Sequence, residues 1–239
     1  WLMIPNVLSA DDIEEMQEFC ERLRHNRESI PAPERSTYGG PLQRLMDHPV
    51  VVGFANEFLA SPYLSSEECY GFRMEMSFSA FRSASDEPPT AFSPHNGNAM
   101  WRMPGDCHEY HCLPGKAFAG LTRVIWELNE VKAGDGGTLF ITGSHKSAFT
   151  APESAYDPNS LLWESYTCPA GSVLFFSEAV THSAVTWNAV HPRIAVLNSY
   201  NSIGGRWHNW EPHPRLVTEM PPLRQTLFRS VHVSENLVG

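Results

Sequence analysis

An alternation of apolar and polar residues constrains the fold of this chain more than any other feature. Within YGFRMEMSFSAFRS, residues 70 to 83, an apolar side chain stands at every second position from Phe72 to Ala80, with a charged or hydroxyl residue between each pair. A period of two is that of a β-strand with one buried face. We therefore predict a strand whose buried side carries Phe72, Met74, Met76, Phe78 and Ala80.

Three later segments have the same strand character. They are FAGLTRVIWEL, GTLFITGSH and GSVLFFSEAVTHSAVTWNAVHPRIAVLNSYN, each rich in β-branched or aromatic residues and bounded by Gly, Asp or Pro. No long helical pattern separates them, which argues against a parallel, doubly wound sheet. We predict a mainly β fold with flanking α-helices, built as an antiparallel double sheet or barrel.

Helical patterns are confined to the amino-terminal part. Ser9 is a good N-cap, and apolar residues recur at helical spacing from Ile13 to Leu23. A second apolar series crosses Pro49, which predicts two short helices or one that restarts there. We expect one domain over 1–239, with a helical part at 1–65, a β core at 70–205 and an extension at 206–239. The polar segment 147–166 reads as a long excursion of the kind that often covers a site.

Composition excludes several classes of function. The formal net charge is -10, which leaves no basic face for nucleic acid or an anionic membrane. No apolar run approaches the roughly 18 residues of a membrane span. The five cysteines are an odd number without a CxxC pair, which favours a reducing compartment, so a soluble cytoplasmic protein is expected.

Two histidines near strand ends are candidate metal ligands, and an arginine follows one of them. His95 stands in the turn-rich segment SPHNGNAMW, and His182 follows an apolar strand. Arg193 comes 11 residues after His182 (193 minus 182), enough for a turn and a return into the same cavity. A buried arginine needs an anionic partner, either a small dicarboxylate that chelates the metal or a protein acid such as Glu178.

The run WELNEVKAGDGGTLFITGSHK, then GSVLFFSEAVTH and Arg193, resembles the phytanoyl-CoA dioxygenase family of Fe(II)- and 2-oxoglutarate-dependent oxygenases. The resemblance covers roughly residues 70 to 200. It implies a double-stranded β-helix, or jelly roll, with Fe(II), 2-oxoglutarate and O2 as cofactors and co-substrates. It also implies that His182 is the distal iron ligand and that Arg193 holds the far carboxylate of 2-oxoglutarate.

The proximal motif departs from the HxD that is usual in the family. Here His95 is followed by Asn96 and Gly97, so a glycine stands at the acid position. His95 is the expected proximal ligand, with His108 as its rival. A carboxylate from Asp106 or Glu109 would be an alternative third ligand.

Iron-dependent halogenases of this superfamily have glycine or alanine at the acid position, where chloride binds instead. The resemblance therefore favours halogenation of an unactivated C–H bond of a small molecule, with chloride as co-substrate. Turn geometry at Gly97 would explain the residue equally well. The alternatives are a hydroxylase or dioxygenase with another carboxylate or with two histidines alone, a protein that has lost its iron, and a jelly roll that binds a small acid without catalysis. If the substrate is anionic, local positive charge is available from Arg73, Arg82, Arg102, Arg123 and Arg206.

Overall fold

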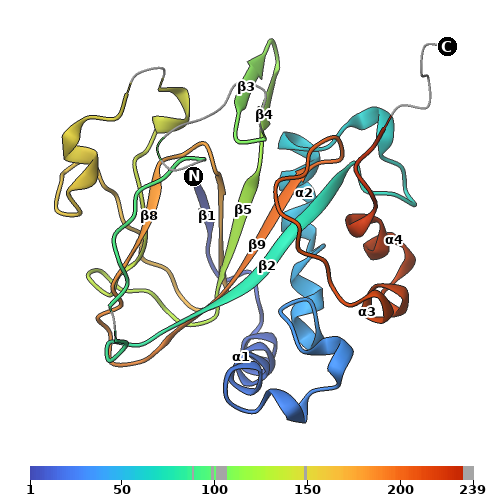
Figure 1. Cartoon of the computed structure of the whole chain (residues 1–239), viewed down its shortest axis with the longest axis horizontal. Coiled ribbons are helices and arrows are strands. Elements are labelled where there is room, and N and C mark those ends of the chain that lie inside the picture. The colour runs from blue at the N-terminus through green and yellow to red at the C-terminus, as the bar shows by residue number, and fades with distance from the viewer. Residues whose placement is uncertain (88, 98–99, 101–106, 148–149, 234–239) are drawn as a thin grey trace.

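The computed structural model describes residues 1–87, 89–97, 100, 107–147 and 150–233, and Figure 1 shows the whole chain. Asp106 and Arg102 lie outside the described residues. The helices are α1 (Ala10–His25), α2 (Pro49–Phe58), α3 (Pro214–Glu219) and α4 (Pro222–Gln225). The strands are β1 (Leu2–Ile4), β2 (Phe72–Arg82), β3 (Tyr110–Leu113), β4 (Lys116–Ala119), β5 (Thr122–Glu127), β6 (Gly137–Phe140), β7 (Ser172–Ser177), β8 (His182–Val185) and β9 (Arg193–Ser202).

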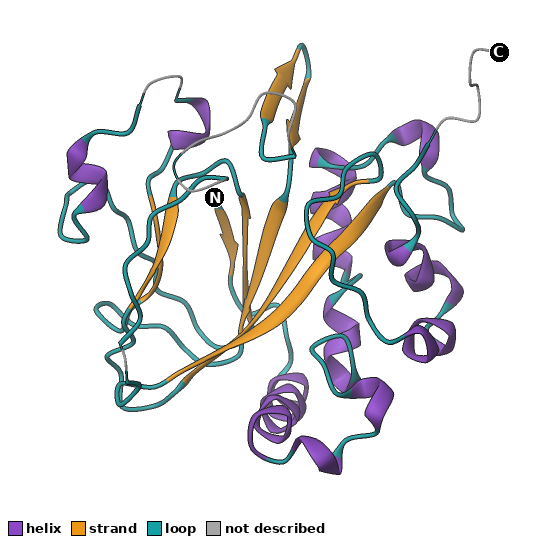
Figure 2. Ribbon diagram, in the orientation of Figure 1, coloured by secondary structure: helices purple, strands orange, loops and turns teal. Residues whose placement is uncertain are grey.

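The described strands form one large antiparallel sheet and two small ones. The large sheet has the order β1-β7-β5-β9-β2, while β6 pairs with β8 and β3 pairs with β4, all antiparallel. Figure 2 shows β6 and β8 across from the large sheet, as expected for the two walls of a jelly roll. The mainly β, antiparallel jelly-roll fold predicted from the sequence is confirmed.

Helices α1 and α2 cover the face of the large sheet that points away from β8 (Figure 1). The hydroxyl oxygen of Ser9 accepts a hydrogen bond of 3.1 Å from the backbone N–H of Asp12, so the predicted cap is present. Pro49 is the first residue of α2, which confirms the predicted restart. Phe54 of α2 stacks on Phe175 of β7 with ring centroids 4.5 Å apart, joining the helical layer to the sheet. The amino-terminal part is helical except for β1, which pairs with β7.

Strand β2 is present as predicted, but its apolar residues do not share one face. The register with β9 shifts between Met74 and Met76, which is a β-bulge. Phe72 and Met74 pack in the core under the helices, whereas Phe78 and Ala80 line a cavity on the opposite face. An extra residue in one strand reverses the direction of the side chains beyond it, so the period of two does not keep one face through a bulge.

The glycine-rich turn GDGG brings β6 close to the turn between β8 and β9. Gly136 has φ +109°, and a Cβ there would lie 2.3 Å from the carbonyl oxygen of Thr186. The backbone N–H of Asn188 donates to the carbonyl oxygen of Asp135 at 2.7 Å. Only a residue without a side chain fits at position 136, so this turn fixes one end of the β6–β8 pair.

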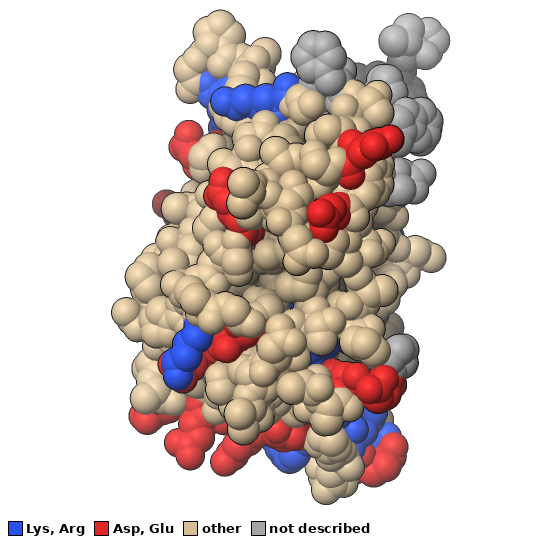
Figure 3. Space-filling view, turned by 90° about the vertical axis from the view of Figure 1, so that its left-hand side faces the viewer, with Lys and Arg blue, Asp and Glu red and all other residues tan. Residues whose placement is uncertain are grey.

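The segment 147–166 meets β6 at an antiparallel bridge between Glu164 and Phe140, and none of its described residues lines the cavity between the sheets. Tyr166 of this segment does contact a residue that lines the cavity, because its hydroxyl oxygen accepts a hydrogen bond of 3.0 Å from Nη2 of Arg193. Figure 3 shows this side of the molecule, where most described side chains are uncharged. None of the described helices is both long enough and apolar enough to span a membrane.

Candidate metal centre

His95 and His182 face each other across an antiparallel bridge. Each backbone N–H donates to the carbonyl oxygen of the other histidine, at 3.0 Å and 2.9 Å. Residues paired directly across antiparallel strands project to the same side, so the imidazoles stand together with ring centroids 4.1 Å apart. Asn96 secures the bridge, because its Nδ2 donates to Oγ1 of Thr181 at 3.0 Å. Two histidines that are 87 residues apart in the chain (182 minus 95) are thus adjacent in space.

The hydrogen bonds of the two rings determine which nitrogens are available to a metal. Nδ1 of His95 lies 2.8 Å from the carbonyl oxygen of Ser93, and Nδ1 of His182 lies 2.7 Å from that of Val180. A carbonyl oxygen only accepts, so each neutral ring carries its hydrogen on Nδ1. Each Nε2 therefore presents a lone pair, and a backbone carbonyl bonded to the other ring nitrogen is the usual support of a metal-binding histidine.

A carboxylate completes a three-residue cluster. The cluster consists of His95, Glu178 and His182, and each offers one possible ligand atom within 4.8 Å of the other two. Oε2 of Glu178 is 3.4 Å from Nε2 of His182. The other carboxylate oxygen, Oε1, lies 2.8 Å from Nε and 2.7 Å from Nη2 of Arg123, and both nitrogens donate to it. The carboxylate is thus held by Arg123 through one oxygen while the other faces the histidines.

The electrostatics of the cluster give His182 and Glu178 the protonation states of metal ligands. Burial lowers the pKa of His182 to about 4, and the attraction of Glu178 opposes this shift only in part. Burial raises the pKa of Glu178, but Arg123 and the two histidines outweigh it and bring the pKa to about 2. At neutral pH the imidazole of His182 is neutral and the carboxylate is ionised, as binding of a divalent metal requires.

The histidines open into a cavity of about 180 Å³ between the two walls of the jelly roll. Its apolar lining includes Ile125, Phe176, Trp187 and Leu197. Phe176 also packs edge-on against His182, with ring centroids 4.7 Å apart, which fixes the orientation of the imidazole. An apolar cavity with a few convergent polar groups is the usual form of a small-molecule site.

Arg193 lines the same cavity and has a protein partner. Its Nε lies 3.2 Å from both carboxylate oxygens of Glu127, its Nη2 lies 2.5 Å from Oε1 of Glu127, and Nη2 also donates to the hydroxyl of Tyr166 at 3.0 Å. The protein acid that neutralises Arg193 is therefore Glu127 and not Glu178. The remaining nitrogen, Nη1, has no hydrogen bond within the described part of the chain. The assignment of Arg193 to 2-oxoglutarate stays a prediction.

The other sequence candidates lie in different surroundings. Gly97 follows His95 with φ +127°, a conformation that side-chain-bearing residues rarely adopt. His108 is buried against Trp207, with ring centroids 4.4 Å apart, and is not part of the three-residue cluster. Glu109 lies 2.5 Å from Nε2 of His111 and is likewise outside the cluster.

The roles of three residues at this site were not predicted from the sequence. Glu178 was considered only as a partner for Arg193, and Glu127 and Tyr166 were not considered. The available signal was an acid within or just after a strongly apolar strand, as in VIWEL and VLFFSEAV. A buried carboxylate requires a nearby cation, and both acids have an arginine.

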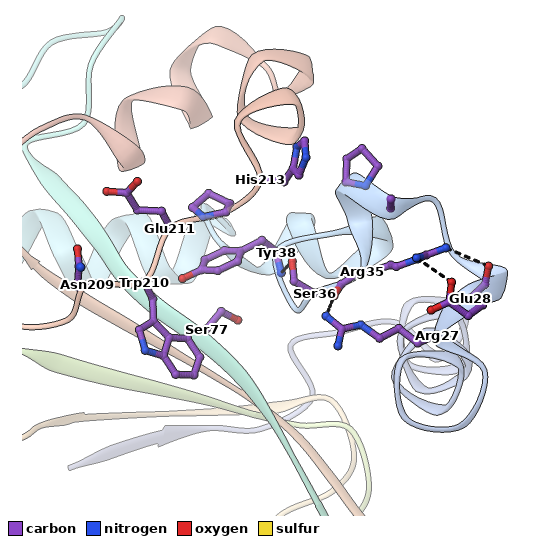
Figure 4. A pocket seen from close by; sticks show the side chains of 13 residues that line it. Arg27, Glu28, Arg35, Ser36, Tyr38, Ser77, Asn209, Trp210, Glu211 and His213 are labelled. Carbon is purple, nitrogen blue, oxygen red and sulfur yellow. Dashed lines mark hydrogen bonds and ion pairs between the residues drawn. The ribbon is translucent and has the colours of Figure 1, made fainter.

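A larger pocket of about 670 Å³ lies on the helical side of the molecule, and Figure 4 shows it between residues 27–38 and 209–213. Several of its charged side chains already have partners within the protein. Arg35 contacts Glu28 at 2.8 Å, Arg27 donates to the carbonyl oxygen of Arg35 at 2.7 Å, and Glu211 pairs with Arg206 at 2.8 Å. Its described residues include no metal-ligand cluster, so the cavity beside His95 and His182 is the better candidate site.

Comparisons with known proteins agree with this fold. The sequence model of the phytanoyl-CoA dioxygenase family (PhyH) matches residues 1–195. HygX from Streptomyces hygroscopicus, solved with nickel and 2-oxoglutarate, is 17% identical over 88% of this chain and 84% of that chain, with a TM-score of 0.66. The 2-oxoglutarate-dependent epimerase SnoN from nogalamycin biosynthesis is 16% identical over 98% of this chain and 90% of that chain, with a TM-score of 0.60.

The nickel complex of the non-heme monooxygenase ThoJ is also similar, at 16% identity over 84% of this chain and 74% of that chain, with a TM-score of 0.55. At these identities the structural likeness establishes the fold. A search of curated proteins found no match.

Proposed function

Because this chain belongs to the phytanoyl-CoA dioxygenase family, we propose that it is an Fe(II)- and 2-oxoglutarate-dependent enzyme that oxidises an unactivated C–H bond of a small molecule. The observation that carries this proposal is the convergence of the Nε2 atoms of His95 and His182 at a cavity that also contains Arg193. HygX has been solved with iron and with nickel and 2-oxoglutarate, and SnoN with Fe3+ and α-ketoglutarate, which supports the same cofactors here.

The residues of the cavity fit these cofactors chemically. Two imidazoles and a carboxylate form the ligand set that suits non-heme Fe(II) and leaves open positions on the metal. Nη1 of Arg193 would hold the far carboxylate of 2-oxoglutarate, since a guanidinium fork binds carboxylates well. When bound, iron and 2-oxoglutarate would activate O2, and the apolar lining at Ile125, Phe176 and Leu197 would exclude bulk water from the oxidation.

Hydroxylation is the outcome that the geometry supports best. Oε2 of Glu178 stands 3.4 Å from Nε2 of His182, beside the position that a metal would take. A buried negative charge there repels a halide, whereas O2 carries no charge and is unaffected. The transformation would consume one 2-oxoglutarate and one O2 for each R–H converted to R–OH, with succinate and CO2 as the other products.

Halogenation is the second candidate, and Gly97 is the observation that favours it. A glycine at this position places no carboxylate beside the metal, as in the halogenases of the superfamily. The positive φ of Gly97 is a separate reason for glycine and does not depend on a halide. The two candidates differ in whether chloride binds to the metal.

The cavity also suggests the charge of the substrate. Arg82 is exposed and lines the cavity, whereas Arg123 and Arg193 are each paired with a glutamate. We propose that Arg82 attracts a substrate with an anionic group to the entrance. Replacement of Arg82 with Gln would then weaken binding of anionic candidates more than that of neutral ones.

The proposed function is tested by an anaerobic titration of the Fe(II)-loaded protein with 2-oxoglutarate, followed by absorption spectroscopy. Chelation of Fe(II) by 2-oxoglutarate produces a charge-transfer band, which we expect for the wild type and for His25→Ala but not for His182→Ala. His25 is a matched control because its side chain is exposed at the end of α1. Absence of the band in the wild type would contradict the proposal. A spectrum that changes on addition of chloride or bromide would favour halogenation over hydroxylation.

A further inference from the structure

We propose that Glu178 is the third protein ligand of the metal and supplies the carboxylate that is missing at Gly97. The inference rests on the proposed function for the identity of the metal, but its test measures metal binding without turnover. Glu178 lies four residues before His182, on the segment that follows β7, and so approaches the metal from a different part of the chain than a carboxylate at position 97 would.

The position of Glu178 is fixed by its surroundings. Its backbone N–H donates to the carbonyl oxygen of Leu121 at 2.8 Å, and the residue is 3% exposed. Arg123 of β5 binds Oε1 of Glu178 through its Nε at 2.8 Å and its Nη2 at 2.7 Å. Because one oxygen is held in this way, the other is aimed at the histidines with little freedom to turn away.

Three electron-pair donors therefore meet at one point, between the half-buried His95 and the buried Glu178 and His182. Nδ1 of both histidines is bonded to a backbone carbonyl, so each Nε2 is an acceptor, as is Oε2 of Glu178. Acceptors that face one another without a shared hydrogen or cation are unfavourable in a protein interior. The separation of 3.4 Å between Nε2 of His182 and Oε2 of Glu178 is close to the roughly 3 Å expected for adjacent ligands, each about 2.1 Å from a metal.

Arg123 is a positioning residue in this arrangement. Its guanidinium neutralises Oε1, and its Nη1 is buried without a hydrogen-bond partner in the described structure. A hydrogen-bonded second oxygen is the usual support of a metal-binding carboxylate. Arg123 therefore keeps Glu178 in place before the metal arrives.

The test is a calorimetric titration of the metal-free full-length protein with Co(II), in parallel with the Co(II) absorption spectrum. Loss of a direct ligand should exceed the 10–100-fold loss in affinity that is typical of supporting groups. We therefore expect Glu178→Ala to weaken Co(II) binding by more than about 100-fold and Arg123→Gln by about 10–100-fold. Glu109→Gln removes an acid of the same type outside the cluster and should bind Co(II) like the wild type.

Glu178→Asp covers the case in which Glu178→Ala does not fold. It keeps a carboxylate near Arg123 but shortens the side chain by one methylene, which withdraws the oxygen from the metal. We expect an unchanged melting temperature without metal and Co(II) binding that is at least about tenfold weaker. Wild-type affinity in both folded variants would overturn the assignment of Glu178.

Addition of chloride gives a second readout that a structural role of Glu178 would not change. With Glu178 on the metal, Glu178→Ala opens one more position and removes a negative charge, so its Co(II) spectrum should respond to chloride at lower concentrations than the wild-type spectrum. A wild type and a Glu178→Ala variant that respond equally to chloride would overturn the inference while leaving the proposed function intact. A wild type that binds no metal would contradict the proposed function itself.

Discussion

Replacement of Arg193 with alanine is expected to destabilise the protein and to abolish binding of 2-oxoglutarate. Arg193 is 4% exposed, and the carboxylate of Glu127 beside it is fully buried. Glu127 contacts the guanidinium through both oxygens and also accepts from the hydroxyl of Tyr166 at 2.6 Å. Without Arg193, the carboxylate would remain in the interior with a single neutral donor.

The expected loss follows from the burial of this pair. Removal of one partner of a buried ion pair typically costs about 3–5 kcal/mol, because the other charge is left without compensation. Both side chains are almost completely buried, so water can hardly solvate the carboxylate that is left unpaired. We therefore expect a loss of unfolding free energy within this range. In a domain of this size each kcal/mol corresponds to about 2–4 °C, which gives a fall in melting temperature of about 6–20 °C.

The assay is urea denaturation of the metal-free protein, with Arg193→Ala, Glu127→Ala and the double variant compared in a cycle. The double variant should be less destabilised than the sum of the two single variants, because no unpaired charge remains in it. Arg193→Lys keeps a charge beside Glu127 and should lose less stability. It should still lose affinity for 2-oxoglutarate, since a lysine lacks the guanidinium fork.

Two results would refute this reasoning. A loss of stability below about 1 kcal/mol in Arg193→Ala would show that Glu127 is solvated or re-paired, contrary to the structure. Wild-type affinity of Arg193→Lys for 2-oxoglutarate would show that the guanidinium does not hold the co-substrate.

Three further substitutions test local features of the fold by urea denaturation. Ser9→Ala removes the cap of α1 and should cost about 1 kcal/mol of unfolding free energy; an unchanged stability would mean that water replaces the hydroxyl. Gly97→Ala forces a side chain into a backbone with φ +127° and should cost about 1–3 kcal/mol, whereas no loss would show that the turn relaxes. Tyr166→Phe leaves Glu127 and Arg193 without the hydroxyl between them and should cost about 1–3 kcal/mol, which a stable variant would contradict.

Much of the fold follows from local sequence patterns. The helix capped by Ser9, the restart at Pro49 and the strand 72–82 are all present, because caps, prolines and periodicity act over a few residues. The faces of β2 were predicted incorrectly, since a bulge at Glu75 depends on pairing with β9 and leaves no clear mark in the sequence. Local patterns thus predict elements better than they predict which way side chains point.

The candidate site was accessible from sequence only in part. His95, His182 and Arg193 were identified through a family resemblance, and the structure brings all three to one cavity. The partners Glu127 and Glu178 could not be assigned, because each acid lies near an arginine only after β5, β7 and β9 have paired. Pairings over distances of 55 and 66 residues are set by sheet topology and not by local sequence.

Oxygen-dependent conversion of 2-oxoglutarate to succinate is the most direct test of the central claim. The purified protein is incubated with Fe(II), 2-oxoglutarate and air without added substrate, and succinate is measured by mass spectrometry. We predict slow succinate formation that requires both Fe(II) and O2, persists in His25→Ala and is lost in His182→Ala. An Fe(II)-loaded wild type that forms no succinate above the His182→Ala background would contradict the claim and favour a binding protein without catalytic activity.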